Sequence, residues 1–255
     1  MEPLGPGIGA IMTTTTHWAA PFFTSKTVVI TGGTGGIGLG LATAFREAGA
    51  IVHATGATDA EVDAAASTPG IAFSRLDVRS DAAVAAYAER FGPIAVLING
   101  AGVNLRAAEF TPDGFSTVLD INLAGTMRAA TAFRPKLAGG AILNIASMFA
   151  FFGAPHAPAY AASKGGVAQL TKSLAIAYAG ESIRVNALAP GWIETPMTAA
   201  PRANPARSAE LVGRTPMGRW GTPADLAGPA LFLCSPLAGF VTGAILPVDG
   251  GYLVS

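Results

Sequence analysis

The chain has 255 residues, of which 51% are hydrophobic and 13% are charged, and its 16 basic and 16 acidic side chains give a formal net charge of zero. This composition supplies a large core and excludes the basic excess of a nucleic-acid-binding or membrane-surface protein. Low charge favours self-association, so we expect a homo-oligomer. A single cysteine, Cys234, excludes an internal disulfide framework and favours a cytoplasmic protein.

The first 23 residues differ from the rest in composition. Residues 1–10 are rich in Gly and Pro, and residues 13–16 form a threonine run. No basic segment precedes a long apolar stretch, so neither a secretory signal nor a membrane-spanning helix is expected. We expect residues 1–23 to be a flexible extension, or to begin upstream of a true initiator at Met12, and residues 24–255 to form one domain.

From Lys26 onward, short apolar strands alternate with helical segments. Strands are expected at 28–30, 51–55, 72–76, 95–98, 141–145, 183–188 and 244–248, and helices at 38–49, 59–66, 81–91, 111–137 (as one helix or two), 157–179 and 222–234. This alternation predicts an α/β fold, with a Rossmann-like doubly wound parallel sheet in a single domain. Polar residues follow the strands at the edge where such sheets bind ligands, including Thr31, Asp77, Asn99 and Ser147.

A glycine-rich turn joins the first strand to the first helix. Residues 32–38 contain five glycines, in the spacing G-x-x-x-G-x-G. The start of a helix offers unpaired N–H groups and a positive dipole end, and glycine lets the backbone approach a pyrophosphate. We interpret the turn as a phosphate-binding loop, although its spacing is shifted from the ordinary dinucleotide fingerprint.

Tyr160 and Lys164 lie four residues apart, on one face of a predicted helix, and Ser147 lies thirteen residues upstream of Tyr160. A free tyrosine has a pKa of about 10, and a nearby ammonium favours the phenolate. The pair is therefore a candidate acid/base for an alcohol or ketone, with the serine hydroxyl holding the same substrate oxygen. Taken alone, the spacing also fits an exposed lysine beside a packed tyrosine.

In their order and spacing, the motifs of residues 26–252 resemble the short-chain dehydrogenase/reductase family. The resemblance rests on Thr31-Gly32-x-x-x-Gly36-Ile37-Gly38, Asp77-Val78, Asn99-Gly100-Ala101-Gly102, Asn122, Ser147, Tyr160-x-x-x-Lys164 and Pro190-Gly191. It implies an oxidoreductase that transfers a hydride between NAD(P) and a secondary alcohol or ketone.

The resemblance also implies the roles of individual residues. Tyr160 would be the acid/base, Ser147 would position the substrate oxygen, and Asn122 would hold a water in a proton relay. Lys164 would bind the nicotinamide ribose and lower the pKa of the tyrosine. With Tyr160 and Lys164, the dinucleotide would be held by Gly32, Thr34, Gly36, Ile37, Gly38, Asp77, Val78, Asn99, Ala101, Gly102, Pro190, Gly191, Ile193 and Thr195. No metal is expected. Without this resemblance, we would interpret Asn99 and Asn122 as turn and helix-cap residues.

The residues after the second strand bear on the choice between NAD and NADP. An acid there binds the ribose 2′-OH, whereas a base accommodates a 2′-phosphate. This chain has Gly56 and Ala57 at these positions, and Gly35 where NADP-dependent relatives often carry a base. Because a 2′-phosphate is costly to hold without a cation, we expect NAD, with the use of NADP left open.

The substrate side is less defined by the sequence. Three phenylalanines between Ser147 and Tyr160 predict an apolar pocket wall, with packing in the core or at an interface as an equal alternative. In relatives, residues corresponding to 196–214 form a lid, where Arg202, Arg207 and Arg214 are candidates to attract an anion or are solvated. In relatives that form tetramers, the helix of Tyr160 packs against a copy of itself, which implies a homotetramer here.

A different class of function uses the same fold. The chain could be a non-catalytic sensor or scaffold that only binds a dinucleotide, because a fold does not determine a function. The joint presence of Ser147, Tyr160 and Lys164 argues for catalysis.

Overall fold

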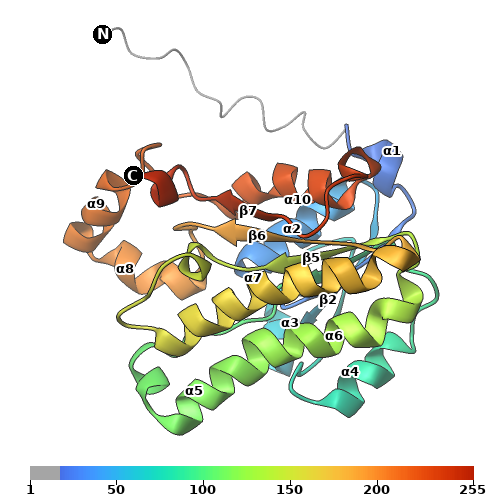
Figure 1. The fold of residues 1–255 in the computed structure, drawn as a ribbon, viewed down its shortest axis with the longest axis horizontal. Helices are drawn as coiled ribbons and strands as arrows, with labels where there is room; N and C mark the ends of the chain where they lie inside the picture. Colours follow the sequence, from blue (N-terminus) through green and yellow to red (C-terminus); the bar gives the residue numbers. More distant parts are fainter. Residues whose placement is uncertain (1–17) are drawn as a thin grey trace, which may run out of the picture.

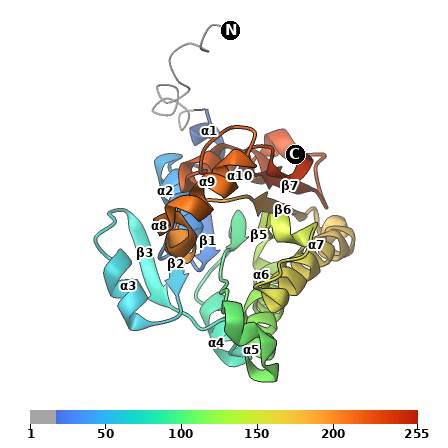
Figure 2. The same cartoon turned by 90° about the vertical axis from the view of Figure 1, so that its left-hand side faces the viewer.

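A seven-stranded parallel sheet organises the protein, whose computed structural model describes residues 18–255. The strands lie in the order β3-β2-β1-β4-β5-β6-β7, so the strand order reverses between β1 and β4. Figure 2 shows β3, β2 and β1 on one side of the sheet and β5, β6 and β7 on the other. Their bounds are β1 Thr27–Thr31, β2 Ile51–Gly56, β3 Ile71–Arg75, β4 Val96–Asn99, β5 Ala141–Ile145, β6 Arg184–Pro190 and β7 Ile245–Val248. The predicted fold class is confirmed.

Helices cover both faces of the sheet (Figure 1). One layer contains α1 (Ala20–Phe23), α2 (Gly36–Glu47) and α10 (Ala227–Cys234). The other layer contains α4 (Asp81–Ala88), α5 (Pro112–Leu119), α6 (Gly125–Phe133) and α7 (Pro158–Tyr178). Helix α3 (Asp59–Ala65) joins β2 to β3. Leu41, Phe45 and Leu231 belong to the apolar cluster of the first layer. Leu97 and Phe133 belong to the cluster of the second. Within residues 18–255, no helix has both the length and the apolar character needed to cross a bilayer.

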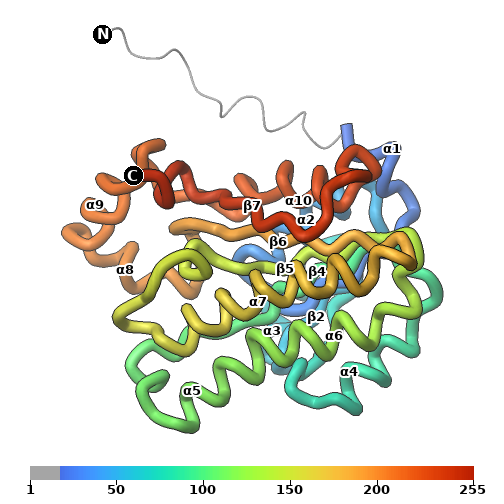
Figure 3. The backbone as a smooth tube through the Cα atoms, viewed as in Figure 1, coloured from blue at the N-terminus to red at the C-terminus, as the bar shows by residue number. Residues whose placement is uncertain are grey.

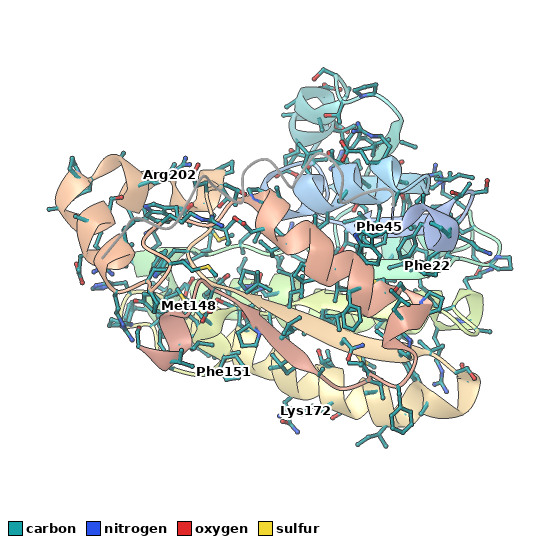
Figure 4. The ribbon with its side chains drawn as sticks, turned by 90° about the horizontal axis from the view of Figure 1, so that it is seen from above. Phe22, Phe45, Met148, Phe151, Lys172 and Arg202 are labelled. Carbon is teal, nitrogen blue, oxygen red and sulfur yellow. The ribbon has the colours of Figure 1, made fainter. Side chains whose placement is uncertain are left out.

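Residues 18–23 pack on the domain. The side chain of Phe23 is buried, and its ring meets that of Phe45 edge to face with centroids 4.9 Å apart. Trp18 and Phe22 lie against the same cluster, and Figure 4 labels Phe22 beside Phe45. The predicted extension to residue 23 is therefore wrong for residues 18–23, because these aromatic rings bury apolar surface. Residues 1–17, with Met12, lie outside the described residues.

The helical segment predicted at 111–137 is two α-helices separated by a π-helical turn, Asp120–Ala124. Such wide turns inside helices are frequent at functional sites, and this one places Asn122 in the interior with no exposed surface. The helix predicted at 222–234 opens with a 3₁₀ turn, and α10 begins at Ala227.

Residues 196–214 contain two short helices that the sequence analysis did not anticipate. These are α8 (Ala199–Ala203) and α9 (Pro205–Gly213). Asn204 caps α9, because its side-chain oxygen accepts a hydrogen bond from the N–H of Arg207. They project at the carboxyl edge of the sheet, at the same end of the molecule as the C-terminus (Figure 3). This end contains the candidate site.

Candidate active site

Two cavities open at the carboxyl edge of the sheet, and Tyr160 lines both. The first has a volume of about 480 Å³ and is bounded by the glycine turn, the segments after β3 and β4, and Lys164. The second has a volume of about 590 Å³ and is bounded by Ser147, the loop before α7, helices α8 and α9, and Tyr252. The Tyr160 side chain therefore stands where a ligand of one cavity would meet a ligand of the other.

Close backbone contacts shape the glycine turn of the first cavity. Gly32 has a φ of +65°, and a Cβ there would lie 2.6 Å from the Cα of Ala101 after β4. A Cβ on Gly38 would lie 2.1 Å from the carbonyl oxygen of Gly32. Only glycine fits at either position, and the first residues of α2 consequently line the cavity. Such a cradle fits a pyrophosphate group.

Most residues predicted to hold a dinucleotide line this first cavity. They are Gly32, Thr34, Gly36, Ile37, Gly38, Asp77, Val78, Ala101, Gly102, Tyr160, Lys164 and Thr195. Asn99, Pro190 and Ile193 are buried and do not line this cavity, and Gly191 lines the second cavity instead. The Asn99 amide donates a hydrogen bond of 2.9 Å to the Asn144 side chain, which ties β4 to β5 below the cavity floor.

Lys164 is buried, and its Nζ donates a 2.6 Å hydrogen bond to the carbonyl oxygen of Ile145 at the end of β5. The same Nζ lies 5.6 Å from the centroid of the Tyr160 ring. Burial in a medium that disfavours the ammonium lowers the pKa of Lys164 to about 8.

The phenol of Tyr160 shows the opposite shift from the one expected. Burial raises the pKa of Tyr160 to about 12; a hydrogen bond with Ser147 opposes this shift, and the negative charge of Glu109 adds to it. The expectation that Lys164 lowers this pKa is not met, because loss of hydration dominates and the lysine Nζ is directed to the Ile145 carbonyl. Tyr160 is therefore a neutral phenol at physiological pH.

Asn122 holds the turn after β4 against helix α7. Its Nδ2 donates to the carbonyl of Val103 at 2.9 Å and to the hydroxyl of Ser163 at 3.0 Å, and its Oδ1 accepts from the N–H of Val103 at 2.8 Å. A Cβ on Gly102 would lie 3.3 Å from this Oδ1 and 3.5 Å from the Nζ of Lys164. The predicted water-holding role of Asn122 stays a prediction.

Glu109 is a site residue that the sequence analysis missed. Its side chain is 1% exposed, and its Oε1 accepts hydrogen bonds from the N–H groups of Leu105 and Arg106 at 2.8 and 3.2 Å. Its Oε2 accepts a third from the N–H of Tyr160 at 2.9 Å. The N-cap of α7 is Ala157, which has no side-chain acceptor, so a distant carboxylate takes that place. A single glutamate at this position belongs to no sequence pattern that would indicate its contact with Tyr160.

Aromatic rings form one wall of the second cavity. Phe149 meets the rings of Phe152, Tyr160 and Trp192 edge to face, with centroids 5.2, 6.2 and 6.0 Å apart. The predicted apolar wall is confirmed for Phe149 and Phe152, both of which line the cavity. Phe151 is instead exposed at the surface (Figure 4).

Polar side chains complete the second cavity. The guanidinium of Arg214 donates a 3.1 Å hydrogen bond to the hydroxyl of Tyr252 and lies 4.3 Å above the centre of its ring. Arg207 also lines this cavity and pairs with Glu210 at 2.6 Å. Arg202 pairs with Glu194 at 3.1 Å and does not contribute to the lining. Across the described part of the chain, no three His, Cys, Asp or Glu side chains are grouped to hold a metal ion.

Comparison with known proteins assigns the family. A family model described as enoyl-(acyl carrier protein) reductase matches residues 32–253. The chain is 41% identical over 238 residues to galactitol 2-dehydrogenase (L-tagatose-forming) of Cereibacter sphaeroides, covering 88% of this chain and 94% of that one. It is 38% identical over 243 residues to 2-dehydro-3-deoxy-D-gluconate 5-dehydrogenase of Pseudoalteromonas atlantica, covering 89% and 96%.

The fold also resembles solved structures of dehydrogenases. The crystal structure of a gluconate 5-dehydrogenase from Burkholderia cenocepacia J2315, in complex with NADP and tartrate, superposes with a TM-score of 0.86. The two sequences are 34% identical, and the match covers 94% of this chain and 100% of the other. The chain therefore belongs to the short-chain dehydrogenase/reductase family of NAD(P)-dependent oxidoreductases.

Proposed function

We propose that the protein interconverts a secondary alcohol and a ketone on a polyol or sugar acid, with Tyr160 as the acid/base. The observation that carries this proposal is the place of Tyr160 at the boundary of two cavities, with Lys164 lining the first and Ser147 the second. A site that only senses a dinucleotide needs neither a second cavity nor a serine that lines this cavity together with the tyrosine. No observation favours the sensor function.

The first cavity would hold the dinucleotide, which supplies or accepts the hydride when bound. The glycine turn would cradle the pyrophosphate, Asp77 and Val78 would border the adenine, and Lys164 would contact the nicotinamide ribose. The nicotinamide end of the site would be formed by Pro190, Gly191, Ile193 and Thr195. Asn99, Ala101 and Gly102 would support the fourth strand and the adenosine ribose. Thr34 would face the adenosine ribose.

In the second cavity, the hydroxyls of Ser147 and Tyr160 would bind one substrate oxygen from two sides. Tyr160 would donate its proton to that oxygen on reduction and take it up on oxidation. Because burial raises the pKa of Tyr160 to about 12, the phenol carries its proton at neutral pH, and it needs a path by which the proton returns after donation. Lys164, whose pKa is lowered to about 8, can gain and lose a proton near neutral pH, and Asn122 would complete the relay toward solvent.

The substrate class is supported by the relatives and by the cavity lining. The relatives are named for galactitol, 2-dehydro-3-deoxy-D-gluconate and gluconate. Asn104, Arg106, His156 and Asn204 also line this cavity and supply donors and acceptors that suit hydroxyl and carboxylate groups. A panel of galactitol, gluconate and apolar secondary alcohols of similar length, followed by nicotinamide absorbance, tests this proposal. We expect the polyol or the sugar acid to have the highest kcat/KM, and a preference for the apolar alcohols would contradict the proposal.

We propose NAD as the preferred dinucleotide, because Gly56, the last residue of β2, and Ala57 after it carry no basic side chain. The relative of known structure in complex with NADP keeps the alternative open. Turnover with each dinucleotide at equal concentration decides between them, and a large preference for NADP would contradict the proposal.

We also propose a homotetramer in the cytoplasm. Ile176 on α7, Phe240 after α10 and Val254 at the C-terminus are large apolar side chains exposed on the single chain, which is typical of surfaces that pack against copies. The single cysteine, Cys234, is buried and suits a reducing compartment. Light scattering on the eluted protein measures the assembly, and a monomer would contradict it.

A further inference from the structure

We infer that Glu61, in the first turn of α3, contacts the 2′ position of the adenosine ribose and selects NAD over NADP. This inference rests on the proposed dinucleotide site and adds a residue to it. The acid that the sequence lacks directly after β2 is supplied from the neighbouring helix, at the cavity where the dinucleotide would bind.

The position of Glu61 follows from the packing around Gly56, the last residue of β2. Glu61 lines the first cavity together with Ala57 and Thr34. A Cβ added to Gly56 would lie 3.0 Å from the Cβ of Glu61 and 2.8 Å from the Cγ2 of Thr34. The Glu61 side chain therefore occupies space that a side chain at position 56 would need. A carboxylate at the end of β2 is present, although it comes from a residue five positions later in the chain.

Hydrogen bonds fix the direction of this carboxylate. Its Oε2 accepts from the N–H groups of Ala57 at 2.6 Å and Thr58 at 3.2 Å, while the hydroxyl of Thr58 accepts from the N–H of Glu61 at 3.2 Å. The two N–H groups that follow β2 are thereby engaged and are not offered to a phosphate. No residue of 18–255 donates a hydrogen bond to Oε1 in this structure, so this atom can accept one from a ribose hydroxyl.

The charges at this end of the cavity disfavour a 2′-phosphate. Arg79 lines the cavity, but its Nε and Nη2 bind both oxygens of Asp77, at 3.0 Å from Nε and 2.6 Å from Nη2. Arg75, beside Gly56 in the sheet, pairs with Asp59 at 3.2 Å. A 2′-phosphate carries between one and two negative charges at neutral pH and would face the Glu61 carboxylate, while both arginines already pair with acids. Like charges placed this close lower affinity, whereas a 2′-OH gains an acceptor.

The test measures binding rather than turnover. Dissociation constants for NADH and NADPH are determined by calorimetry on the purified protein and on Glu61→Gln, which keeps an oxygen for the helix cap and removes the charge. The wild type should bind NADH at least about tenfold more tightly than NADPH, because the Glu61 carboxylate would repel the 2′-phosphate. In Glu61→Gln the NADPH affinity should rise about tenfold, and the NADH affinity should fall. The matched control is Asp63→Asn, an exposed acid on the same helix, which should change neither constant.

A second measurement avoids any variant. Wild-type protein is titrated with 5′-AMP and with 2′,5′-ADP, which differ only in the 2′-phosphate, and 5′-AMP should bind more tightly. The role of Glu61 is overturned if 2′,5′-ADP binds as tightly as 5′-AMP or more tightly. It is also overturned if folded Glu61→Gln keeps the wild-type ratio of the NADH and NADPH dissociation constants. Either result leaves the proposed dinucleotide site in place. Failure of the wild type to bind either dinucleotide overturns the proposed function and this inference together.

Discussion

The carboxylate of Glu109 accepts a hydrogen bond of 2.9 Å from the backbone N–H of Tyr160, across 51 residues of sequence. The same side chain binds the N–H groups of Leu105 and Arg106, so one buried acid fixes both the turn after β4 and the first turn of α7. The position of the phenol between the two cavities thus depends on a group that does not itself line either of them.

Replacing Glu109 should affect both stability and pH dependence. Glu109→Ala leaves three N–H groups without their acceptor, so we expect a loss of about 2 kcal/mol in the free energy of unfolding, with a fall in kcat. Glu109→Gln keeps an acceptor but removes the charge that raises the pKa of Tyr160. The alkaline limb of its kcat/KM profile should therefore move to lower pH, as measured by initial rates across the pH range.

The control for Glu109 is the exposed acid Glu89, which pairs loosely with Lys136 at 3.8 Å. Glu89→Gln should leave the pH profile and the stability unchanged. An unaltered alkaline limb in Glu109→Gln would show that its charge does not act on Tyr160.

Lys164 should make stability depend on pH. Because its pKa is lowered from 10.5 to about 8, the folded protein binds fewer protons than the unfolded chain between these values. The free energy of unfolding should therefore rise with pH across this window relative to Lys164→Met, in which the contribution is absent. Urea unfolding of both proteins from neutral pH to about pH 9.5 measures the difference between their free energies of unfolding. The pH range ends there because Tyr160 makes a contribution of opposite sign at higher pH. A constant difference would contradict the lowered pKa.

The glycine turn offers a matched pair of substitutions. Gly38→Ala places a Cβ where the carbonyl oxygen of Gly32 lies 2.1 Å away, so the turn must open. Gly35 has an extended backbone, and no atom lies within 4 Å of its added Cβ. We expect Gly38→Ala to weaken NADH binding at least about tenfold, which corresponds to about 1.4 kcal/mol, and Gly35→Ala to bind nearly as the wild type does. Fluorescence titration measures both, and equal effects would contradict a pyrophosphate cradle at this turn.

Much of the fold was predictable because its strands are continuous apolar runs that end at glycine or polar residues. The strand at 141–145 has the predicted bounds, since Gly140 and Ser147 bracket a run that is apolar except for Asn144. The sequence left open whether residues 111–137 form one helix or two, because the π-helical turn that divides them follows from the contacts of Asn122 with Val103 and Ser163. Such tertiary contacts leave no periodic signal in a sequence.

The candidate site was predictable where local spacing sets geometry. The turn at 32–38 and the Tyr160–Lys164 pair depend on neighbours in sequence. Glu109 was missed because it acts on a distant part of the chain, through the N–H of Tyr160. Glu61 was missed because only the folded structure shows that its side chain lines the cavity beside Gly56. The pKa of Tyr160 was expected in the wrong direction, because loss of hydration is a property of the folded environment.

The most direct test compares Tyr160→Phe with the wild type in turnover of the preferred polyol or sugar acid and in NADH binding. The substitution removes one hydroxyl and keeps the ring that packs against Phe149. We predict that kcat falls by about 10²- to 10⁴-fold, as for loss of an acid/base group, while the dissociation constant for NADH stays close to that of the wild type. Near-normal turnover in Tyr160→Phe would contradict the assignment of this phenol as the proton donor and acceptor.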